Sequence, residues 1–338
     1  MNIGVIGYGY WGPNIVRNFN ALEDVQVAAV SDLRPERLKL VRTAYPHITQ
    51  LVTDPRRLLD SSDIEAVAIC TPVATHFELA REALQRGKHV LVEKPMTATS
   101  EQAAELIEQA DRNGCCLMVD HTFVYTGAVR KIKRILESGE LGELYYYDGV
   151  RVNLGLFQHD VNVVWDLAPH DLSIMDYLLP GPPRSVAATG VAHFNGGQEN
   201  IAYLTIRYDN NLIAHLHVNW LAPVKVRQTM LSGSKKMIIY DDNEPSEKVK
   251  VYDRGVAMQG DEDRLHALMV QYRLGDMYAP RIDQTEALAR VTREFCDAVQ
   301  SGSKPLTDGE AGRRVVRLLE AADESMRNNG MPVGVEGL

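Results

Sequence analysis

The sequence has few cysteines, no excess of positive charge and no long apolar run. Its 338 residues include four cysteines, none at Cys-x-x-Cys spacing, so we expect reduced thiols rather than a disulfide framework or a zinc site. Lys and Arg number 36 against 45 Asp and Glu, a formal charge of −9, which argues against nucleic acid as a partner. The first apolar run, residues 3–6, is too short for a signal peptide, and no later run reaches a membrane-spanning length. We therefore expect a cytoplasmic protein with no nucleic-acid or membrane partner.

The first half of the chain alternates short apolar runs with helical segments. At about 100–200 residues per domain, 338 residues predict two domains. Runs rich in Val, Ile and Leu, separated by helices, are typical of a doubly wound parallel sheet, which is an α/β fold. These runs are residues 3–6, 25–30, 66–70, 89–92 and 116–119.

The pattern changes after residue 122. Residues 203–208 and 212–220 alternate apolar and polar side chains, which predicts antiparallel strands with one covered face. Residues 284–300 and 309–328 return to helical spacing, so the second domain should be a sheet backed by helices. We predict a dinucleotide-binding domain over 1–122 and a substrate-binding and oligomerisation domain over 123–338. The segment 254–284 shows little periodicity and is interpreted as a lid or as a contact with a second subunit.

A strand, a glycine-rich turn and a helix open the chain. The turn reads Gly7-Tyr-Gly9-Tyr10-Trp11-Gly12 and follows the first apolar run directly. In a dinucleotide-binding turn, the first glycine makes the tight bend, the second lets the pyrophosphate approach the backbone, and the third lets helix and strand pack closely. We therefore place five residues of the turn at the cofactor: Gly7, Gly9, Tyr10, Trp11 and Gly12. The alternative is a glycine-rich turn that holds no ligand.

Asp32 ends the second apolar run. It stands about 20 residues beyond the glycines, where a carboxylate binds the 2′-hydroxyl of the cofactor ribose. Arg34 is placed to meet a 2′-phosphate, but a carboxylate beside that phosphate is repulsive. The pattern favours NAD over NADP, and the alternative for Asp32 is an ordinary solvated acid in a turn.

Several motifs at the ends of later strands carry a family resemblance. Thr71-Pro72 with His76, the run Glu93-Lys94-Pro95, and Trp165-Asp166-Leu-Ala-Pro-His170-Asp171 together resemble the Gfo/Idh/MocA oxidoreductases. The resemblance implies an N-terminal Rossmann domain and a C-terminal α/β domain with a large, open, mostly antiparallel sheet. That sheet often packs into dimers or tetramers, so we expect a homodimer or homotetramer.

The same resemblance supplies further cofactor contacts. It places Thr71, Pro72, His76, Glu93 and Lys94 at the cofactor, although Glu93 alternatively caps a helix. It also raises the expectation of a cis bond at Pro95.

A narrower resemblance points to a substrate class. Arg151-Val-Asn153, the segment 165–174 and Tyr272-Arg-Leu-Gly-Asp276 look like the branch that acts on UDP-N-acetylhexosamines or their uronates. One departure is visible at residues 124–127, which read Val-Tyr-Thr-Gly where many members have Arg-Tyr/Phe-Asn-Pro. A substrate contact made by that arginine in other members has no counterpart at this position.

Hydride transfer from a secondary alcohol requires a base for the hydroxyl proton and a donor for the reacting oxygen. We assign His170 as the base, because an imidazole accepts a proton at physiological pH, and Lys94 as the donor. The reverse assignment stays open. Asp166 lies four residues before His170, so on a helix both project from one face. The predicted catalytic residues are Lys94, His170 and Asp166, and these three bind substrate together with Asn153.

The sequence as a whole predicts an NAD-dependent dehydrogenase that oxidises C3 of a UDP-N-acetylhexosamine or its uronate to a 3-keto sugar. Two alternatives stay open. One is a dehydrogenase of a free polyol, inositol or simple sugar, and the other is a non-catalytic regulatory protein that senses NAD(P). No metal site is expected, because the paired histidines His215 and His217 have no further ligand at suitable spacing.

Overall fold

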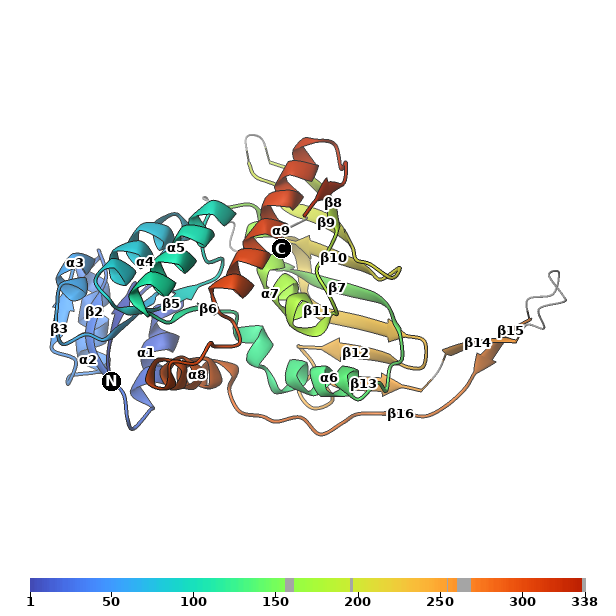
Figure 1. Cartoon of the computed structure of the whole chain (residues 1–338), viewed down its shortest axis with the longest axis horizontal. Coiled ribbons are helices and arrows are strands. Elements are labelled where there is room, and N and C mark those ends of the chain that lie inside the picture. Colours follow the sequence, from blue (N-terminus) through green and yellow to red (C-terminus); the bar gives the residue numbers. More distant parts are fainter. Residues whose placement is uncertain (156–160, 195–196, 254, 260–268, 336–338) are drawn as a thin grey trace. The chain divides into compact units, whose positions relative to one another are not determined.

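The computed structural model forms two compact units (Figure 1). The first unit contains residues 1–126 and 285–320, and the second contains residues 127–284 and 321–338. Among the described residues, no helix is both long enough and apolar enough to span a membrane. The structure describes residues 1–155, 161–194, 197–253, 255–259 and 269–335.

The first unit is built on a six-stranded sheet in the order β3-β2-β1-β4-β5-β6, with every neighbouring pair parallel. This confirms the predicted doubly wound sheet and adds β3, a three-residue strand too short to show a sequence pattern. The strands are β1 (Asn2–Ile6), β2 (Gln26–Ser31), β3 (Gln50–Val52), β4 (Ala66–Ile69), β5 (His89–Glu93) and β6 (Leu117–Asp120). The helices are α1 (Gly12–Asn20), α2 (Pro35–Ala44), α3 (Pro55–Leu59), α4 (His76–Gln85), α5 (Ser100–Asn113) and α8 (Ala287–Ser301), with the short η1 (Val73–Thr75) and η2 (Thr122–Tyr125).

Strands β4 and β6 are buried on both faces. All four residues of β4 and all four of β6 are buried, which explains why these strands read as continuous apolar runs rather than alternating ones. Parallel strands end at one edge of their sheet, so the loops after β1, β2, β4, β5 and β6 gather there. This carboxyl edge carries the glycine-rich turn, Asp32, Thr71 and Lys94.

The segment 285–320 belongs with the first unit because it packs on α1 and β6. Phe295 of α8 meets Phe19 of α1 edge to face, with ring centroids 6.2 Å apart. Thr307 accepts a 2.8 Å backbone hydrogen bond from Val119 of β6. The predicted boundary after residue 122 does not include the return of residues 285–320 to the first unit. The division into 1–122 and 123–338 stays a prediction.

The second unit is built on a nine-stranded sheet in the order β16-β13-β12-β11-β7-β10-β9-β8-β17. Among these described strands, β7 and β10 pair in parallel and the other neighbours pair antiparallel, which confirms the predicted open, mostly antiparallel sheet. The strands are β7 (Leu144–Leu154), β8 (Ser185–Val191), β9 (Ile201–Arg207), β10 (Ile213–Asn219), β11 (Leu221–Gly233), β12 (Met237–Asp241), β13 (Val249–Tyr252), β16 (Met277–Tyr278) and β17 (Val333–Gly334).

Helices α6 (Gly127–Glu137) and α7 (Val163–Leu178) pack together, and α7 covers β7, β9 and β10. Strand β10 alternates buried and more exposed residues, as its sequence predicts. Helix α9 (Gly309–Arg327) begins in the first unit and ends in the second. Within the segment 254–284, β14 (Gly255–Gln259) pairs with β15 (Met269–Arg273), while residues 260–268 lie outside the described part of the chain.

A buried ion pair joins α7 to the sheet. Arg151 of β7 donates to Asp171 of α7 through Nε at 2.5 Å and through a terminal nitrogen at 3.4 Å. Both side chains are 4% exposed. Two desolvated charges are tolerated only as a pair, so this contact holds α7 in one position on the sheet.

We predict that Asp171→Ala lowers the free energy of unfolding by about 3–5 kcal/mol, because it leaves the Arg151 guanidinium buried without its carboxylate. The double variant Arg151→Met with Asp171→Leu should lose less than Asp171→Ala alone, since it removes both charges. Chemical denaturation of the two variants and the parent protein measures the difference. Equal losses would show that the charge pairing is not what holds this contact.

Candidate active site

The glycine-rich turn joins β1 to α1 at the carboxyl edge of the first sheet. Gly7 has a φ of 95°, and a Cβ there would lie 2.7 Å from the carbonyl oxygen of Cys70. A Cβ on Gly12 would lie 2.1 Å from the carbonyl oxygen of Gly7, so a side chain would push the helix off the strand. A Cβ on Gly9 would meet, among the described residues, only the Arg34 guanidinium at 3.6 Å. The turn therefore has a closely packed base and an open backbone surface that fits a pyrophosphate.

Tyr10 and Trp11 fill the middle of this turn and differ in exposure. Tyr10 is 88% exposed. Trp11 is partly buried, and its indole N–H donates a 2.9 Å hydrogen bond to the carboxylate of Asp120. Trp11 thus ties the turn to the end of β6, and the cofactor contacts expected of the two aromatic residues stay predictions.

Asp32 is a buried carboxylate directly after β2. Its Oδ2 accepts from the Tyr8 backbone N–H at 2.8 Å, and its Oδ1 accepts from the backbone N–H and Nε of Arg34 at 2.9 and 3.2 Å. Burial acts to raise the pKa of Asp32, but these hydrogen bonds outweigh it and lower the pKa. The carboxylate is therefore ionised at neutral pH, and its partner Arg34 is already engaged by a negative charge.

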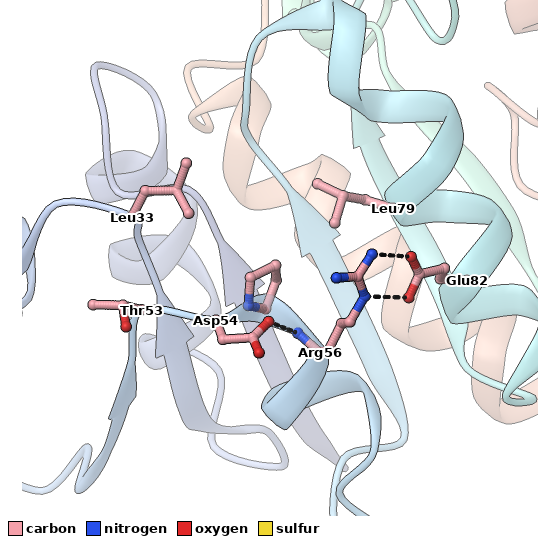
Figure 2. Close-up of a pocket in the computed structure, with 7 residues that line it drawn as sticks. Leu33, Thr53, Asp54, Arg56, Leu79 and Glu82 are labelled. Atoms are coloured by element: carbon pink, nitrogen blue, oxygen red, sulfur yellow. Dashed lines mark hydrogen bonds and ion pairs between the residues drawn. The ribbon is translucent and has the colours of Figure 1, made fainter.

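A pocket of about 410 Å³ opens beside Asp32 (Figure 2). Leu33, which follows Asp32, and Leu79 of α4 stand on opposite sides of it. Arg56 donates to both carboxylate oxygens of Glu82 at 3.1 and 3.3 Å and closes one end. Apolar walls with an ion pair at one end fit a flat, partly polar ring system.

His76 lies behind the edge rather than at its surface. The side chain is buried, with Nδ1 2.9 Å from the Pro95 carbonyl oxygen and Nε2 2.8 Å from the Thr71 carbonyl oxygen. Burial lowers the pKa of the His76 ring. The imidazole thus links the loop after β4, which carries Thr71 and Pro72, to the loop after β5. Contact between His76 and the cofactor, expected from the resemblance, stays a prediction.

Lys94 follows β5 directly and is bonded to Pro95 by a cis peptide, a bond whose expectation the family resemblance raised. Its backbone N–H donates a 3.0 Å hydrogen bond to Oε2 of Glu93. Glu93 is also the register partner of Asp120 on the neighbouring strand β6, so the two side chains lie on the same side of the sheet. Among the described residues, then, Glu93 meets protein groups of this edge.

The sequence analysis did not identify Asp120 and His121, two residues at the end of β6. Asp120 is 2% exposed and accepts from Trp11 and, at 2.6 Å, from the Thr122 hydroxyl. His121 is 1% exposed, and neither ring nitrogen has a hydrogen-bond partner among the described residues. Because buried polar atoms are nearly always hydrogen-bonded, this orphaned ring near Lys94 fits an edge completed by a bound molecule. The sequence signal that identified Asp32, a carboxylate at the end of an apolar run, is also present at Asp120.

Helix α7 of the second unit carries Asp166 and His170. The segment is helical, which is the condition under which the sequence places both residues on one face, so the two side chains lie one turn apart on that face. Asn162 caps the helix by accepting from the backbone N–H groups of Val164 and Trp165 at 3.0 and 3.1 Å. Asp166 accepts a 3.0 Å hydrogen bond from the buried indole of Trp220. The indole fixes the Asp166 carboxylate on the same face as His170.

Asn153 is a partly buried residue of β7, two positions after Arg151. Alternate residues of a strand share a face, and Arg151 reaches Asp171 of α7. Asn153 therefore lies on the face of the sheet that α7 covers.

The predicted site residues fall into two groups, each described within its own unit. The glycine-rich turn, Asp32, Thr71, Pro72, Glu93 and Lys94 share the carboxyl edge of the first sheet. Asn153, Asp166 and His170 belong to the second unit. Among the described residues, no three side chains of His, Cys, Asp or Glu gather as metal ligands would.

Family models match both parts of the chain. Residues 1–121 match the oxidoreductase family with an NAD-binding Rossmann fold, and residues 129–239 match the GFO/IDH/MocA C-terminal domain. The chain is also 30% identical to the oxidoreductase YdgJ of Escherichia coli K12 over 73% of each chain. The protein belongs to the Gfo/Idh/MocA family of oxidoreductases, as its motifs indicated. It is an enzyme with an NAD-binding Rossmann domain.

Relatives with different substrates resemble the chain over nearly its whole length. It is 26% identical to the UDP-N-acetylglucosamine 3-dehydrogenase of Acidithiobacillus ferrooxidans over 94% of each chain. The solved structure of that enzyme, GnnA, matches with a TM-score of 0.81 over 98% of this chain and 99% of its own. The chain is 24% identical to the myo-inositol 2-dehydrogenase of Thermotoga maritima over 96% of each chain.

We predict that His121 makes the protein less stable in acid. Burial, together with the positive charge of Lys94, lowers the pKa of His121 to about 3 in the folded state. Between that pKa and the ordinary value of about 6.5, the His121 ring is protonated in the unfolded chain and neutral in the folded protein. The free energy of unfolding therefore falls as the pH drops below about 6.5. At about 1.4 kcal/mol per pKa unit, the loss grows to several kcal/mol near the folded pKa.

The variant His121→Phe should lose less stability than the parent between neutral pH and pH about 4, because it has no ring to protonate. Denaturant titrations at several pH values measure both slopes. The exposed His47 offers a matched control, since His47→Phe should leave the acid slope unchanged. Parallel slopes for the parent and His121→Phe would contradict the assignment.

Proposed function

We propose that the protein is an NAD-dependent dehydrogenase that oxidises a secondary hydroxyl group of a sugar. The substrate we favour is a UDP-N-acetylhexosamine or its uronate, oxidised at C3 to a 3-keto sugar. The observation that carries the proposal is Lys94 at the carboxyl edge that also holds the glycine-rich turn and Asp32. The likeness to the A. ferrooxidans enzyme over 94% of both chains supports the substrate class.

The first unit would hold NAD along its carboxyl edge. The open backbone at Gly9 suits the pyrophosphate, and the ionised Asp32 suits a ribose hydroxyl. The pocket between Leu33 and Leu79 suits the adenine ring. Bound NAD supplies the acceptor for the substrate hydride.

Two side chains would handle the substrate hydroxyl. His170 accepts its proton, and Lys94 donates a hydrogen bond to the reacting oxygen; the reverse assignment is the alternative. Asp166, fixed by Trp220, either orients the His170 ring or binds a sugar hydroxyl. Asn153 lies on strand β7, which α7 covers, and binds the sugar from there.

A second candidate is a dehydrogenase of inositol or another free polyol. It is favoured by the match to the T. maritima myo-inositol 2-dehydrogenase, which covers 96% of each chain at 24% identity. The two candidates share the roles of Lys94 and His170 and differ in whether the site must also bind a nucleotide.

We further propose that the enzyme works in the cytoplasm, on a small molecule, as a homodimer or homotetramer. The less covered face of the second sheet carries Tyr203 stacked on His217, with ring centroids 4.4 Å apart, and Tyr203 is 45% exposed. Such an aromatic face is suited to contact another copy of the chain. Light scattering of the purified protein measures its mass.

Reduced-nicotinamide absorbance tests the function. Purified protein and NAD are mixed with UDP-N-acetylhexosamines, their uronates, free sugars and inositol, at enzyme concentrations that reveal a single turnover. Reduction with a UDP-sugar supports the first candidate, and reduction with only free polyols supports the second. Silence across the panel, with NAD bound, would mean that the substrate lies outside the classes tested.

We predict that Lys94→Ala and His170→Ala each lower turnover by about 10²–10⁴, the usual contribution of a positioned acid or base. Both should still bind NAD, because neither change touches the glycine-rich turn. Stopped-flow reduction of NAD measures the chemistry, and calorimetry measures cofactor binding. Turnover within about twofold of the parent in either variant would remove that residue from the proposed mechanism.

We predict that Asp32→Ala reduces the preference for NAD over NADP. The change removes a hydrogen-bond acceptor for the ribose and the charge that repels a 2′-phosphate, so the preference should fall by about 10- to 100-fold. The ratio of kcat/KM for the two cofactors measures it. Asp60→Ala, an exposed carboxylate between α3 and β4, is the control that should leave the ratio unchanged. An unaltered ratio in Asp32→Ala would argue against ribose binding by this residue.

A further inference from the structure

A pair of carboxyl groups stands at the ends of the neighbouring strands β5 and β6, beside the proposed catalytic lysine. Glu93 ends β5 and Asp120 ends β6, and the two residues are partners in the parallel register of these strands. Register partners on parallel strands point to the same side of the sheet, so the two carboxyl groups lie side by side. Two carboxylates in contact repel each other, and a hydrogen bond between them requires a proton.

The surrounding donors decide which carboxyl carries that proton. Asp120 is 2% exposed and accepts from the Trp11 indole at 2.9 Å and the Thr122 hydroxyl at 2.6 Å. Among the described residues, Glu93 accepts a hydrogen bond from the backbone N–H of Lys94. Three donors converge on Asp120 when Glu93 is the acid, which favours the ionised form of Asp120.

We infer that Glu93 and Asp120 share one proton, carried by Glu93, and that this carboxyl pair positions Lys94 and the glycine-rich turn for the proposed reaction. Glu93 holds the backbone of Lys94, and Asp120 holds Trp11 in the middle of the turn. The pair thus connects the part of the edge that would hold the pyrophosphate to the part that carries the chemistry. The positioning role rests on the proposed function, whereas the shared proton does not.

The charges that face the pair support a neutral Glu93. Burial, followed by the charge of Asp120, raises the pKa of Glu93 well above its ordinary value. Lys94 acts in the opposite direction but does not outweigh these effects. Cys70, after β4, is held as a neutral thiol because burial raises its pKa, and His121 is neutral at physiological pH. The pair of Glu93 and Asp120 therefore presents one negative charge rather than two to the Lys94 region.

The direction of the pH dependence follows from a raised folded-state pKa. The contribution of the pair is fully present below the ordinary pKa of a glutamate and is lost as the pH rises through the folded value. Deprotonation of Glu93 removes the shared proton and places two carboxylates side by side, so their repulsion acts on the edge that holds Trp11 and Lys94. NAD affinity and melting temperature should both fall at alkaline pH for this reason.

Two matched amide substitutions test the assignment. Glu93→Gln keeps a donor toward Asp120 and an acceptor for Lys94, whereas Asp120→Asn turns an NH₂ group toward one of the donors Trp11 and Thr122. With NAD alone as the probe, Asp120→Asn should bind about tenfold more weakly than the parent at neutral pH, and Glu93→Gln should lose clearly less. Glu93→Gln should also lose the alkaline fall in NAD affinity and melting temperature.

A direct signature and a control complete the experiment. The infrared carbonyl stretch of a protonated carboxyl group should be present in the parent at neutral pH and absent in Glu93→Gln. Glu320→Gln is the control, since Glu320 accepts two hydrogen bonds from Ser100 and faces Arg317 rather than a carboxylate. It should keep both the infrared band and the alkaline fall.

The inference is overturned if the band is missing from the parent, if Glu93→Gln keeps the alkaline fall, or if it loses as much NAD affinity as Asp120→Asn. None of these readouts needs a sugar. A parent protein that binds NAD and shows the band but oxidises no substrate of the panel would argue against the proposed substrates while leaving the shared proton established.

Discussion

Parallel pairing of the six strands in the first unit is the constraint on which the cofactor half of the site depends. It brings the ends of β1, β2, β4, β5 and β6 to one edge, although these ends are more than 100 residues apart along the chain at the extremes. The side chains there then contact partners from other loops. Trp11 reaches Asp120, and the His76 ring spans the loops after β4 and β5. The edge is a connected network and does not consist of independent loops.

Sequence reasoning succeeds where a function depends on local backbone geometry. The spacing of Gly7, Gly9 and Gly12 is set by one turn, and the contacts a Cβ would make at Gly7 and Gly12 explain why glycine stands there. The helical spacing of Asp166 and His170 is likewise local, and α7 bears it out. The apolar runs of the first unit are visible because parallel strands are buried on both faces.

The same reasoning fails where neighbouring strands decide a residue's role. Asp120 and His121 follow an apolar run just as Asp32 does, yet only the pairing of β5 with β6 shows that Asp120 meets Glu93. The return of residues 285–320 to the first unit depends on the packing of Phe295 against Phe19, which no spacing in the sequence reveals. Helix α7 is also held by a tertiary contact, the buried pair of Arg151 and Asp171.

Two carboxyl groups on the same sheet edge show how local partners set different protonation states. Asp32 is surrounded by donors, from the Tyr8 and Arg34 backbones and the Arg34 side chain, which lower its pKa despite burial. Glu93 faces a second carboxyl and one backbone donor, so burial and repulsion raise its pKa. The same edge therefore holds a carboxyl group with a lowered pKa at Asp32 and one with a raised pKa at Glu93, beside Lys94. Aspartate and glutamate side chains differ by a single methylene group, so the opposite pKa shifts of Asp32 and Glu93 follow from their neighbouring groups and not from their residue types.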